Sequence, residues 1–197
     1  MKGLRAQLIS VKDNLNLLLV LVFCLMATSL YAESASKMTI SAGPSFNYQH
    51  IFYDSDNYQN RKTLGPGFSF SFDYALSHPV ALGTNVTYEY ESYKNFYSYH
   101  DLKVSLNAIV HLSKKDRADR VVNFYALMGS GVDFVFRNDG DFGLYFLIRS
   151  GLAADFRLST KVNLYVKPLV EMTFQKGSSV LHASVGIGAT VKLGGLQ

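Results

Sequence analysis

A histidine and a serine two residues apart are the first pair in this sequence that could do chemistry. In His182-Ala183-Ser184 the imidazole could take the proton of the hydroxyl and make it a nucleophile, provided that a third group orients the ring. Side chains two residues apart in a β-strand point to the same face, and this pair falls on the polar face of its segment. Val185 follows the serine, and we assign no catalytic role to the pair.

A second group of candidates would suit chemistry on an acyl chain. His50, His100 and Asp101 lie near serines, and Pro44 and Pro66 could each remove a ladder hydrogen bond and open a lateral gap between strands. An acyl chain also needs an apolar pocket, which these residues could line: Ile109, Tyr125, Leu127, Tyr145, Leu147, Tyr165 and Leu169. In the alternative interpretation, the prolines sit at bulges and the apolar residues simply pack against charged neighbours.

All of these residues belong to segments in which apolar and polar side chains alternate. From Met38 to Tyr48, every even-numbered residue is apolar or aromatic and every odd-numbered residue is small or polar. This period of two predicts a β-strand with one apolar and one polar face. The same split predicts strands over residues 38–48, 64–74, 80–91, 101–112, 123–136, 144–157, 162–174 and 181–193. Each is long enough to cross a bilayer when tilted, which takes about 9–11 residues.

The glycines indicate which face points inward. They share the polar face of the predicted strands, at Gly43, Gly65, Gly67, Gly83, Gly129, Gly131, Gly151, Gly186 and Gly188. A narrow eight-stranded barrel has little room inside, so glycines there would make space for long charged neighbours. We therefore expect a closed eight-stranded antiparallel transmembrane β-barrel with its apolar face in lipid. A soluble barrel or sandwich is the alternative, because it would place the apolar face inside.

Charge and aromatic residues agree with this orientation. The polar face is nearly balanced, with Asp73, Glu89, Glu91, Asp101, Asp133, Asp155 and Glu171 against Lys103, Arg149, Arg157, Lys167 and Lys192. We expect these groups to pair inside the barrel, centred on Glu89, Asp133, Arg149, Lys167 and Glu171, and to fill a narrow lumen. Aromatic residues gather at one end of the apolar face, as in an interfacial girdle: Phe46, Tyr48, Tyr88, Tyr90, Phe134, Phe136 and Phe174.

The first residues differ from the rest of the chain. Lys2, Arg5 and Lys12 precede the uncharged run 14–32, which predicts a signal peptide over residues 1–32, a short periplasmic leader over 33–37, the barrel over 38–193 and a tail over 194–197. A transmembrane helix is the alternative for the run, whereas lipidation of Cys24 is disfavoured because Phe23 precedes it. Without the leader the chain has 16 basic and 14 acidic residues and no cysteine, so its charge gives no reason to expect nucleic-acid binding.

The connectors also fit a membrane barrel. With a periplasmic N-terminus, the outer loops would be residues 49–62, 92–99, 137–142 and 175–178, and the inner turns 77–79, 113–120 and 159–161. All four outer loops exceed the two tightest inner turns, as in outer-membrane barrels. The outer loops hold aromatic residues that could contact a surface ligand or anchor in headgroups: Tyr53, Tyr58, Tyr93, Phe96 and Tyr97.

Over residues 38–193 the chain resembles the small outer-membrane β-barrels, the group of the outer-membrane protein A transmembrane domain and the opacity-type adhesins. The resemblance implies a bacterial outer-membrane location and insertion by the barrel-assembly machinery, whose last-strand signal is matched by the spacing of Gly186, Gly188, Val191 and Leu193. The chain ends in Gly194-Gly195-Leu196-Gln197 instead of the family's usual aromatic residue.

Two enzyme families of the same barrel class are weaker matches. Lipid A deacylases carry a His-x-Ser pair, but theirs faces the lipid and an asparagine follows the serine, unlike Val185 here. His50 and His100, which were considered above for chemistry on an acyl chain, resemble the histidines of a barrel enzyme that transfers palmitate to lipid A.

We therefore expect a non-enzymatic, monomeric outer-membrane protein without a cofactor or metal, with lipid around it and a structural or surface-interaction role carried by its outer loops. The alternative is a barrel that binds or laterally passes a hydrophobic molecule, or that modifies lipid A.

Overall fold

The computed structural model describes residues 38–53, 61–77, 79–92, 98–113, 121–138, 140–175 and 178–193. The predicted leader, the tail and four of the five predicted outer-loop contact residues lie outside these ranges. Among the described residues, no helix is long and apolar enough to cross a membrane.

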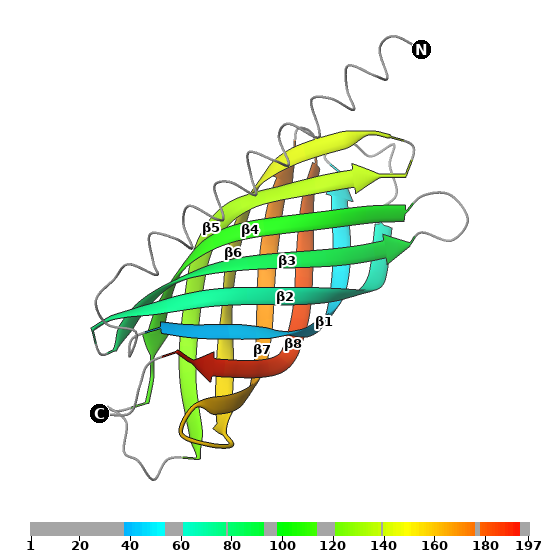
Figure 1. The fold of residues 1–197 in the computed structure, drawn as a ribbon. Helices are drawn as coiled ribbons and strands as arrows, with labels where there is room; N and C mark the ends of the chain where they lie inside the picture. Colours follow the sequence, from blue (N-terminus) through cyan, green and yellow to red (C-terminus); the bar gives the residue numbers. More distant parts are fainter. Residues whose placement is uncertain are drawn as a thin grey trace. The chain divides into compact units, whose positions relative to one another are not determined.

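Eight antiparallel strands form one closed barrel (Figure 1). They are β1 (Met38–Tyr53), β2 (Arg61–Ser77), β3 (Val80–Ser92), β4 (Ser98–His111), β5 (Val122–Arg137), β6 (Phe142–Arg157), β7 (Val162–Gln175) and β8 (Ser178–Lys192). Each strand pairs with its neighbours in sequence, and β1 closes the barrel on β8 from Thr39↔Lys192 to Tyr53↔Ser178. The predicted fold class is confirmed.

Burial follows the alternation in the sequence. Along β4, Asn107 and Ile109 are buried. Leu106 and Val110, which flank this pair, are 62% and 41% exposed. The same outward exposure holds for large apolar residues of every strand, including Phe46, Leu64, Leu82, Met128, Leu144, Val170 and Ile187. The predicted orientation is therefore present in the fold, with the apolar face outside and the polar face inside.

The strands extend further than the alternation predicted. Residues 49–53 continue β1 and residues 61–62 already belong to β2, although both stretches were expected in an outer loop. Ladder pairs such as Gln49↔Thr63 and Ile51↔Arg61 hold this extension together. Strand pairing needs only backbone hydrogen bonds, so it can continue where an apolar outer face is no longer required. Tyr53 is consequently the last residue of β1 and not a loop residue.

The inward glycines have a different physical role from the predicted one. A Cβ at Gly43 would collide with the backbone carbonyl of Ile187, and one at Gly131 with that of Val104. At most of these positions the nearest obstacle is the backbone of a neighbouring strand, with side chains closest only at a few, such as Gly83 against Asp73. Glycine thus permits close approach of strands in a narrow barrel, more than it makes space for long side chains.

Each strand proline is associated with an interruption in one ladder. The β1–β8 pairing skips Gly43 and Pro44, the β6–β7 pairing skips Pro168, and the β2–β3 pairing begins just after Pro66 at Gly67↔Glu89. Proline has no backbone N–H to donate, which accounts for the loss on one side only. The ladder of β1 with β2 runs through both Pro44 and Pro66 without a gap.

Candidate functional site

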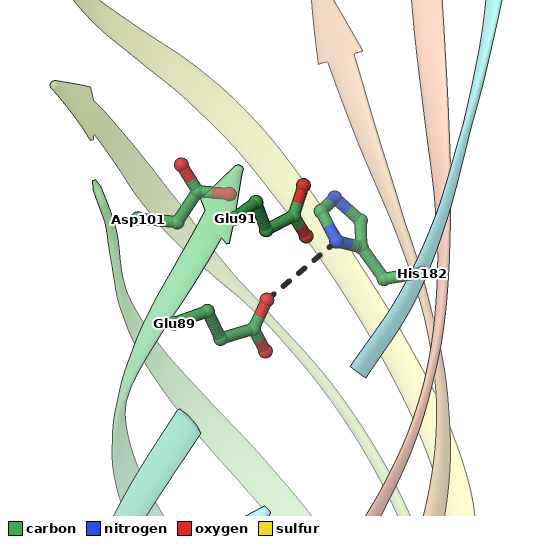
Figure 2. A group of neighbouring side chains, drawn as sticks. All are labelled: Glu89, Glu91, Asp101 and His182. Carbon is green, nitrogen blue, oxygen red and sulfur yellow. Dashed lines mark ion pairs between the residues drawn. The ribbon is translucent and has the colours of Figure 1, made fainter. Parts of the chain in front are cut away.

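The candidate site lies inside the barrel, in the half that contains the C-terminal ends of β1, β3, β5 and β7. Glu89 and Glu91 project inward from β3, Asp101 from β4 and His182 from β8 (Figure 2). All four are fully buried, and the His182 Nδ1 atom lies 3.7 Å from Glu89 Oε2. Their inward direction follows from the alternation, since each lies on the polar face of its strand, which Glu89 and Glu91 share with Gly83 and His182 shares with Gly186.

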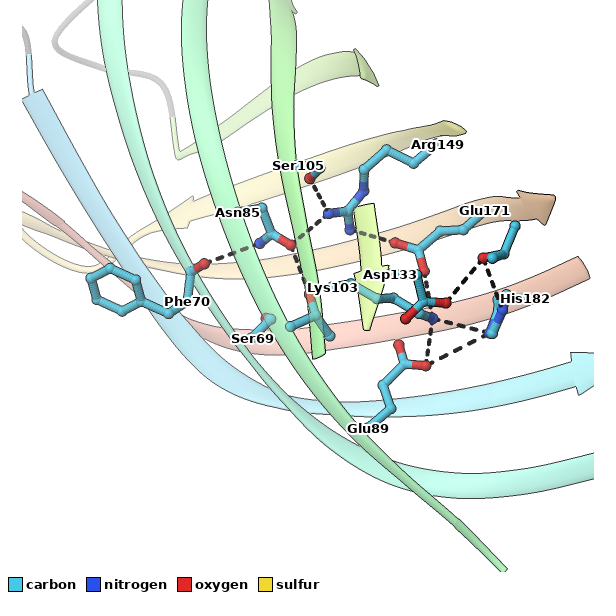
Figure 3. A network of polar contacts seen from close by, with 12 residues as sticks. Ser69, Phe70, Asn85, Glu89, Lys103, Ser105, Asp133, Arg149, Glu171 and His182 are labelled. Atoms are coloured by element: carbon cyan, nitrogen blue, oxygen red, sulfur yellow. Dashed lines mark hydrogen bonds and ion pairs between the residues drawn. The ribbon is translucent and has the colours of Figure 1, made fainter. Parts of the chain in front are cut away.

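Lys103 on β4 is the centre of the polar network (Figure 3). Its Nζ atom lies 2.6 Å from Glu89 Oε2, 2.9 Å from Glu171 Oε2 and 3.0 Å from His182 Nδ1. An ammonium group has three N–H donors, so these contacts use all of them. Three strands separate β4 from β8 in either direction around the barrel, and the Lys103–His182 contact therefore spans the interior.

Arg149 on β6 extends the network toward the middle of the barrel. Its guanidinium forms an ion pair of 2.7 Å with Glu171 Oε1 and donates to Ser105 Oγ at 2.7 Å and to Asn85 Oδ1. Asn85 in turn donates to the Phe70 carbonyl oxygen, at 3.2 Å. The arginine thereby joins β6 to β3, β4 and β7 in one hydrogen-bonded set.

His182 has a definable role in this set. Thr173 Oγ1 donates to Asp133 Oδ2 at 3.2 Å and lies 3.4 Å from His182 Nε2. Because the threonine hydroxyl has a single proton, the Nε2–H of a neutral His182 is the group that can donate to Thr173. Nδ1 then accepts from Lys103, and the contacts form one chain from Lys103 through His182 and Thr173 to Asp133.

The charges inside the barrel are not evenly distributed. Glu89, Glu91, Asp101, Asp133 and Glu171 are all buried in the same half, and the buried cations among the described residues there are Lys103 and Arg149. Arg137, nearer the rim, pairs with the exposed Asp141 at 3.2 Å. The near balance expected from the whole polar face is therefore wrong for this half, because Lys167 and other cations counted in that balance lie elsewhere along the barrel.

The five residues predicted as the network separate into two places. Glu89, Arg149 and Glu171 belong to the set around Lys103, and Asp133 joins it through Thr173. Lys167 lies apart, with its Nζ atom 5.1 Å from the centre of the Tyr165 ring. Alternation had placed Lys103 and His182 on the polar face, but spacing along one strand does not reveal which residues meet across a barrel.

The other half of the interior contains an apolar cluster. Ala81, Ile109, Tyr125, Leu127, Ala153 and Leu169 form a packed cluster, each at most 8% exposed. Leu147 and Tyr165 are also buried, and Asp155 accepts from Tyr125 and Asn163 at this end, each at 3.4 Å. Of the seven residues predicted to offer an acyl pocket, Ile109, Tyr125, Leu127 and Leu169 thus pack in one cluster.

The histidines considered for chemistry do not form a common site. His100 faces outward and its Nδ1 atom lies 2.6 Å from the Tyr88 hydroxyl, whereas the adjacent Asp101 faces inward. The His50 ring stacks on Phe52 at 4.2 Å. His182 and Ser184 are both buried in the interior, as their place on the polar face implied. Of the predicted outer-loop contacts, Tyr58, Tyr93, Phe96, Tyr97 and the side chain of Tyr53 lie outside the described residues.

Comparison of the fold with solved structures finds small outer-membrane barrels. Neisserial surface protein A is matched with a TM-score of 0.61 at 11% identity, over 79% of this chain and 96% of that one. Ail, the attachment invasion locus protein of Yersinia pestis, is matched with a TM-score of 0.51 at 12% identity, over 78% and 99% of the two chains. OprG, an outer membrane protein of Pseudomonas aeruginosa, has a TM-score of 0.51 at 13% identity, over 82% and 98%.

No family model and no curated protein matches the sequence. The chain nevertheless has the fold of a bacterial outer-membrane β-barrel, in the small eight-stranded class that the sequence resembled.

Proposed function

We propose that this protein is a non-enzymatic integral protein of the bacterial outer membrane, with an interior closed by its own side chains and a surface-interaction role carried by its outer loops. The observation that carries the proposal is the contact between Lys103 and His182, which spans the barrel interior at 3.0 Å. Side chains that hydrogen-bond across a narrow barrel leave no wide aqueous path at that level.

The outer surface supports a membrane location. Large apolar side chains are exposed on all eight strands, for example Phe68 at 51%, Met128 at 70% and Leu152 at 57%. An apolar surface of this extent would be unfavourable in water, and a closed barrel satisfies the backbone hydrogen bonds that lipid cannot. Outer-membrane lipid is accordingly the first partner, and insertion would require the barrel-assembly machinery. We propose a monomer, because the closed sheet has no edge strand to share.

The surface role is proposed for Tyr53, Tyr58, Tyr93, Phe96 and Tyr97. Two structural neighbours carry names that fit such a role: one is a surface protein and the other an attachment invasion locus protein. The latter has also been solved in complex with a heparin analogue, sucrose octasulfate. Rigid aromatic side chains provide contact area at low entropic cost, which suits an adhesive surface.

Planar-bilayer recording tests the closed interior. We expect the purified protein to show no large, stable conductance, because the Lys103 and Arg149 contacts occupy the interior. Removing both long side chains in a Lys103→Ala/Arg149→Ala variant should raise the conductance. Porin-like conductance of the unaltered protein would contradict the proposal.

A second candidate function is binding or lateral passage of a hydrophobic molecule, or modification of lipid A. The observation in its favour is the apolar cluster around Ile109, Tyr125, Leu127 and Leu169 in the interior, together with a β2–β3 ladder that begins only after Pro66. Mass analysis of lipid A from cells with and without the protein tests the enzymatic form. A changed acyl pattern would favour this candidate over the non-enzymatic one.

A further inference from the structure

Three buried carboxylates and an imidazole converge within the barrel interior. Glu89, Glu91, Asp101 and His182 can each place one ligand atom so that all four atoms lie within 4.8 Å of one another. Figure 2 shows the carboxylates projecting from neighbouring strands toward the same space as His182. Glu89 and Asp101 are directly paired residues of β3 and β4, which accounts for the proximity of their carboxylates.

Asp101 gives an independent reason to expect a ligand. Its side chain is 1% exposed, and neither Oδ1 nor Oδ2 has a hydrogen-bond partner. Glu89 Oε1 and Glu91 Oε1 are likewise without a partner, although Thr63 donates to the other oxygen of Glu91 at 2.7 Å. A buried carboxylate without any donor is costly, so a group that supplies positive charge at this position would be stabilising.

The neighbouring cations do not meet this need. Lys103 directs its three N–H groups to Glu89 Oε2, Glu171 and His182, and Arg149 is engaged by Glu171, Ser105 and Asn85. Among the described residues, five buried carboxylates in this half of the interior face the buried cations Lys103 and Arg149. The oxygens without a partner are both oxygens of Asp101, Oε1 of Glu91 and Oε1 of Glu89.

We propose that Glu89, Glu91 and Asp101 bind one divalent cation of the size of Ca²⁺. Their ligand atoms, together with that of His182, lie within 4.8 Å of one another, which is close enough for one ion to contact the three carboxylates. Ca²⁺ accepts flexible oxygen coordination at about 2.3–2.6 Å, whereas Mg²⁺ requires near-ideal octahedral geometry at about 2.0–2.1 Å. Carboxylate oxygens are the ligands that Ca²⁺ prefers. His182 lines the site without serving as a ligand, because its two ring nitrogens contact Lys103 and Thr173.

The sequence predicted no metal because its ligands do not form a recognisable motif. They come from two adjacent strands and meet through the β3–β4 register, whereas a calcium loop places its ligands at set positions of a single loop. A bound ion would link β3 to β4 across their inner face and neutralise part of the excess charge.

Equilibrium binding of radioactive Ca²⁺ tests the proposal on the protein purified in a non-ionic detergent free of anionic lipid. We expect one ion per barrel, at least tenfold weaker binding by Asp101→Asn, and a similar loss in Glu91→Gln. Asp155→Asn is the matched control, since it removes a half-buried inward carboxylate that has its own donors in the other half of the barrel. Its affinity should equal that of the unaltered protein.

Measuring Ca²⁺ binding by the unaltered protein is sufficient to overturn the proposal, whether or not the variants fold. Absence of Ca²⁺ binding by the unaltered barrel at neutral pH would mean that protons, and not a metal, compensate the excess carboxylates. Equal weakening in Asp155→Asn would also contradict it, by assigning the binding to the overall charge of the protein. A rise in unfolding temperature with Ca²⁺ that is lost in Asp101→Asn would support it.

Discussion

At the scale of single residues, Lys103 connects four strands of the barrel through one ammonium group. Its ammonium group joins β4 to β3, β7 and β8 through Glu89, Glu171 and His182. Without it, carboxylates that are completely buried would lose their cation. The stability of this half of the barrel therefore depends on one positive charge more than on any single apolar contact.

Replacing Lys103 by methionine preserves the length of the side chain and removes its charge. We expect Lys103→Met to lower the free energy of unfolding by about 3–5 kcal/mol, the usual cost of leaving a buried charge without its partner. Urea titration followed by gel migration measures the effect, with Lys62→Met as the control because Lys62 is exposed. Equal stability of the two variants would show that the contacts around Lys103 are energetically unimportant.

The sequence indicated which residues of this network face inward but not which of them meet. Alternation assigned Glu89, Lys103 and His182 to the polar face from local information alone. Contacts between β4 and β8 depend on how the sheet closes and on the stagger of its strands, which no local pattern contains. For the same reason Lys167 was grouped with Arg149 although it lies against Tyr165.

At the scale of the strands, glycine determines how closely neighbours approach. Gly131 lies against the backbone of Val104 and Ser105, so any side chain there would force β4 and β5 apart. Gly186 differs, because the nearest atom to a Cβ at that position is a ring carbon of Tyr165 at 3.6 Å. Both glycines face inward, and the alternation in the sequence does not distinguish them.

The two glycines should therefore respond differently to the same substitution. We expect Gly131→Ala to destabilise the barrel by about 1–3 kcal/mol through overpacking, and Gly186→Ala to be neutral or stabilising by less than about 1 kcal/mol. Unfolding midpoints in urea compare the pair directly. Similar losses in both variants would argue against backbone approach as the reason for glycine at position 131.

The strands themselves could be predicted because the two faces of each strand appear in the sequence as alternating apolar and polar residues. The strand ends could not be predicted. Strands β1 and β2 continue past His50 and Lys62, whose outward side chains are polar, and backbone pairing alone maintains the strands there. The interrupted ladder at Pro168 was also not anticipated, although proline in a strand always removes one donor.

At the scale of the whole molecule, the exposed apolar belt determines where the barrel can reside. Leu106 is 62% exposed in the middle of β4, and Leu112 is 59% exposed just after the strand ends. The first would face hydrocarbon and the second the interface with water. Their similar exposure makes them a matched pair for testing depth.

A charge should be tolerated at one of these positions only. We expect Leu106→Arg to cost about 2–4 kcal/mol in a bilayer and Leu112→Arg about 0–1 kcal/mol, following the depth dependence of arginine on lipid-facing barrel surfaces. Folding titrations in phospholipid vesicles measure both. A soluble barrel would tolerate the two substitutions equally, because water would surround both positions.

The most direct test of the central claim, that the apolar face of a closed barrel lies in lipid, is a nitroxide scan of residues 104–110 on β4. Single cysteines in a Cys24→Ser background would be labelled after reconstitution into vesicles, and collision rates with oxygen and with a water-soluble relaxation agent measured for each. The account predicts oxygen maxima with a period of two at Leu106, Ala108 and Val110, and low values at Ser105, Asn107 and Ile109. Maxima for the water-soluble agent at Leu106, Ala108 and Val110 would contradict it.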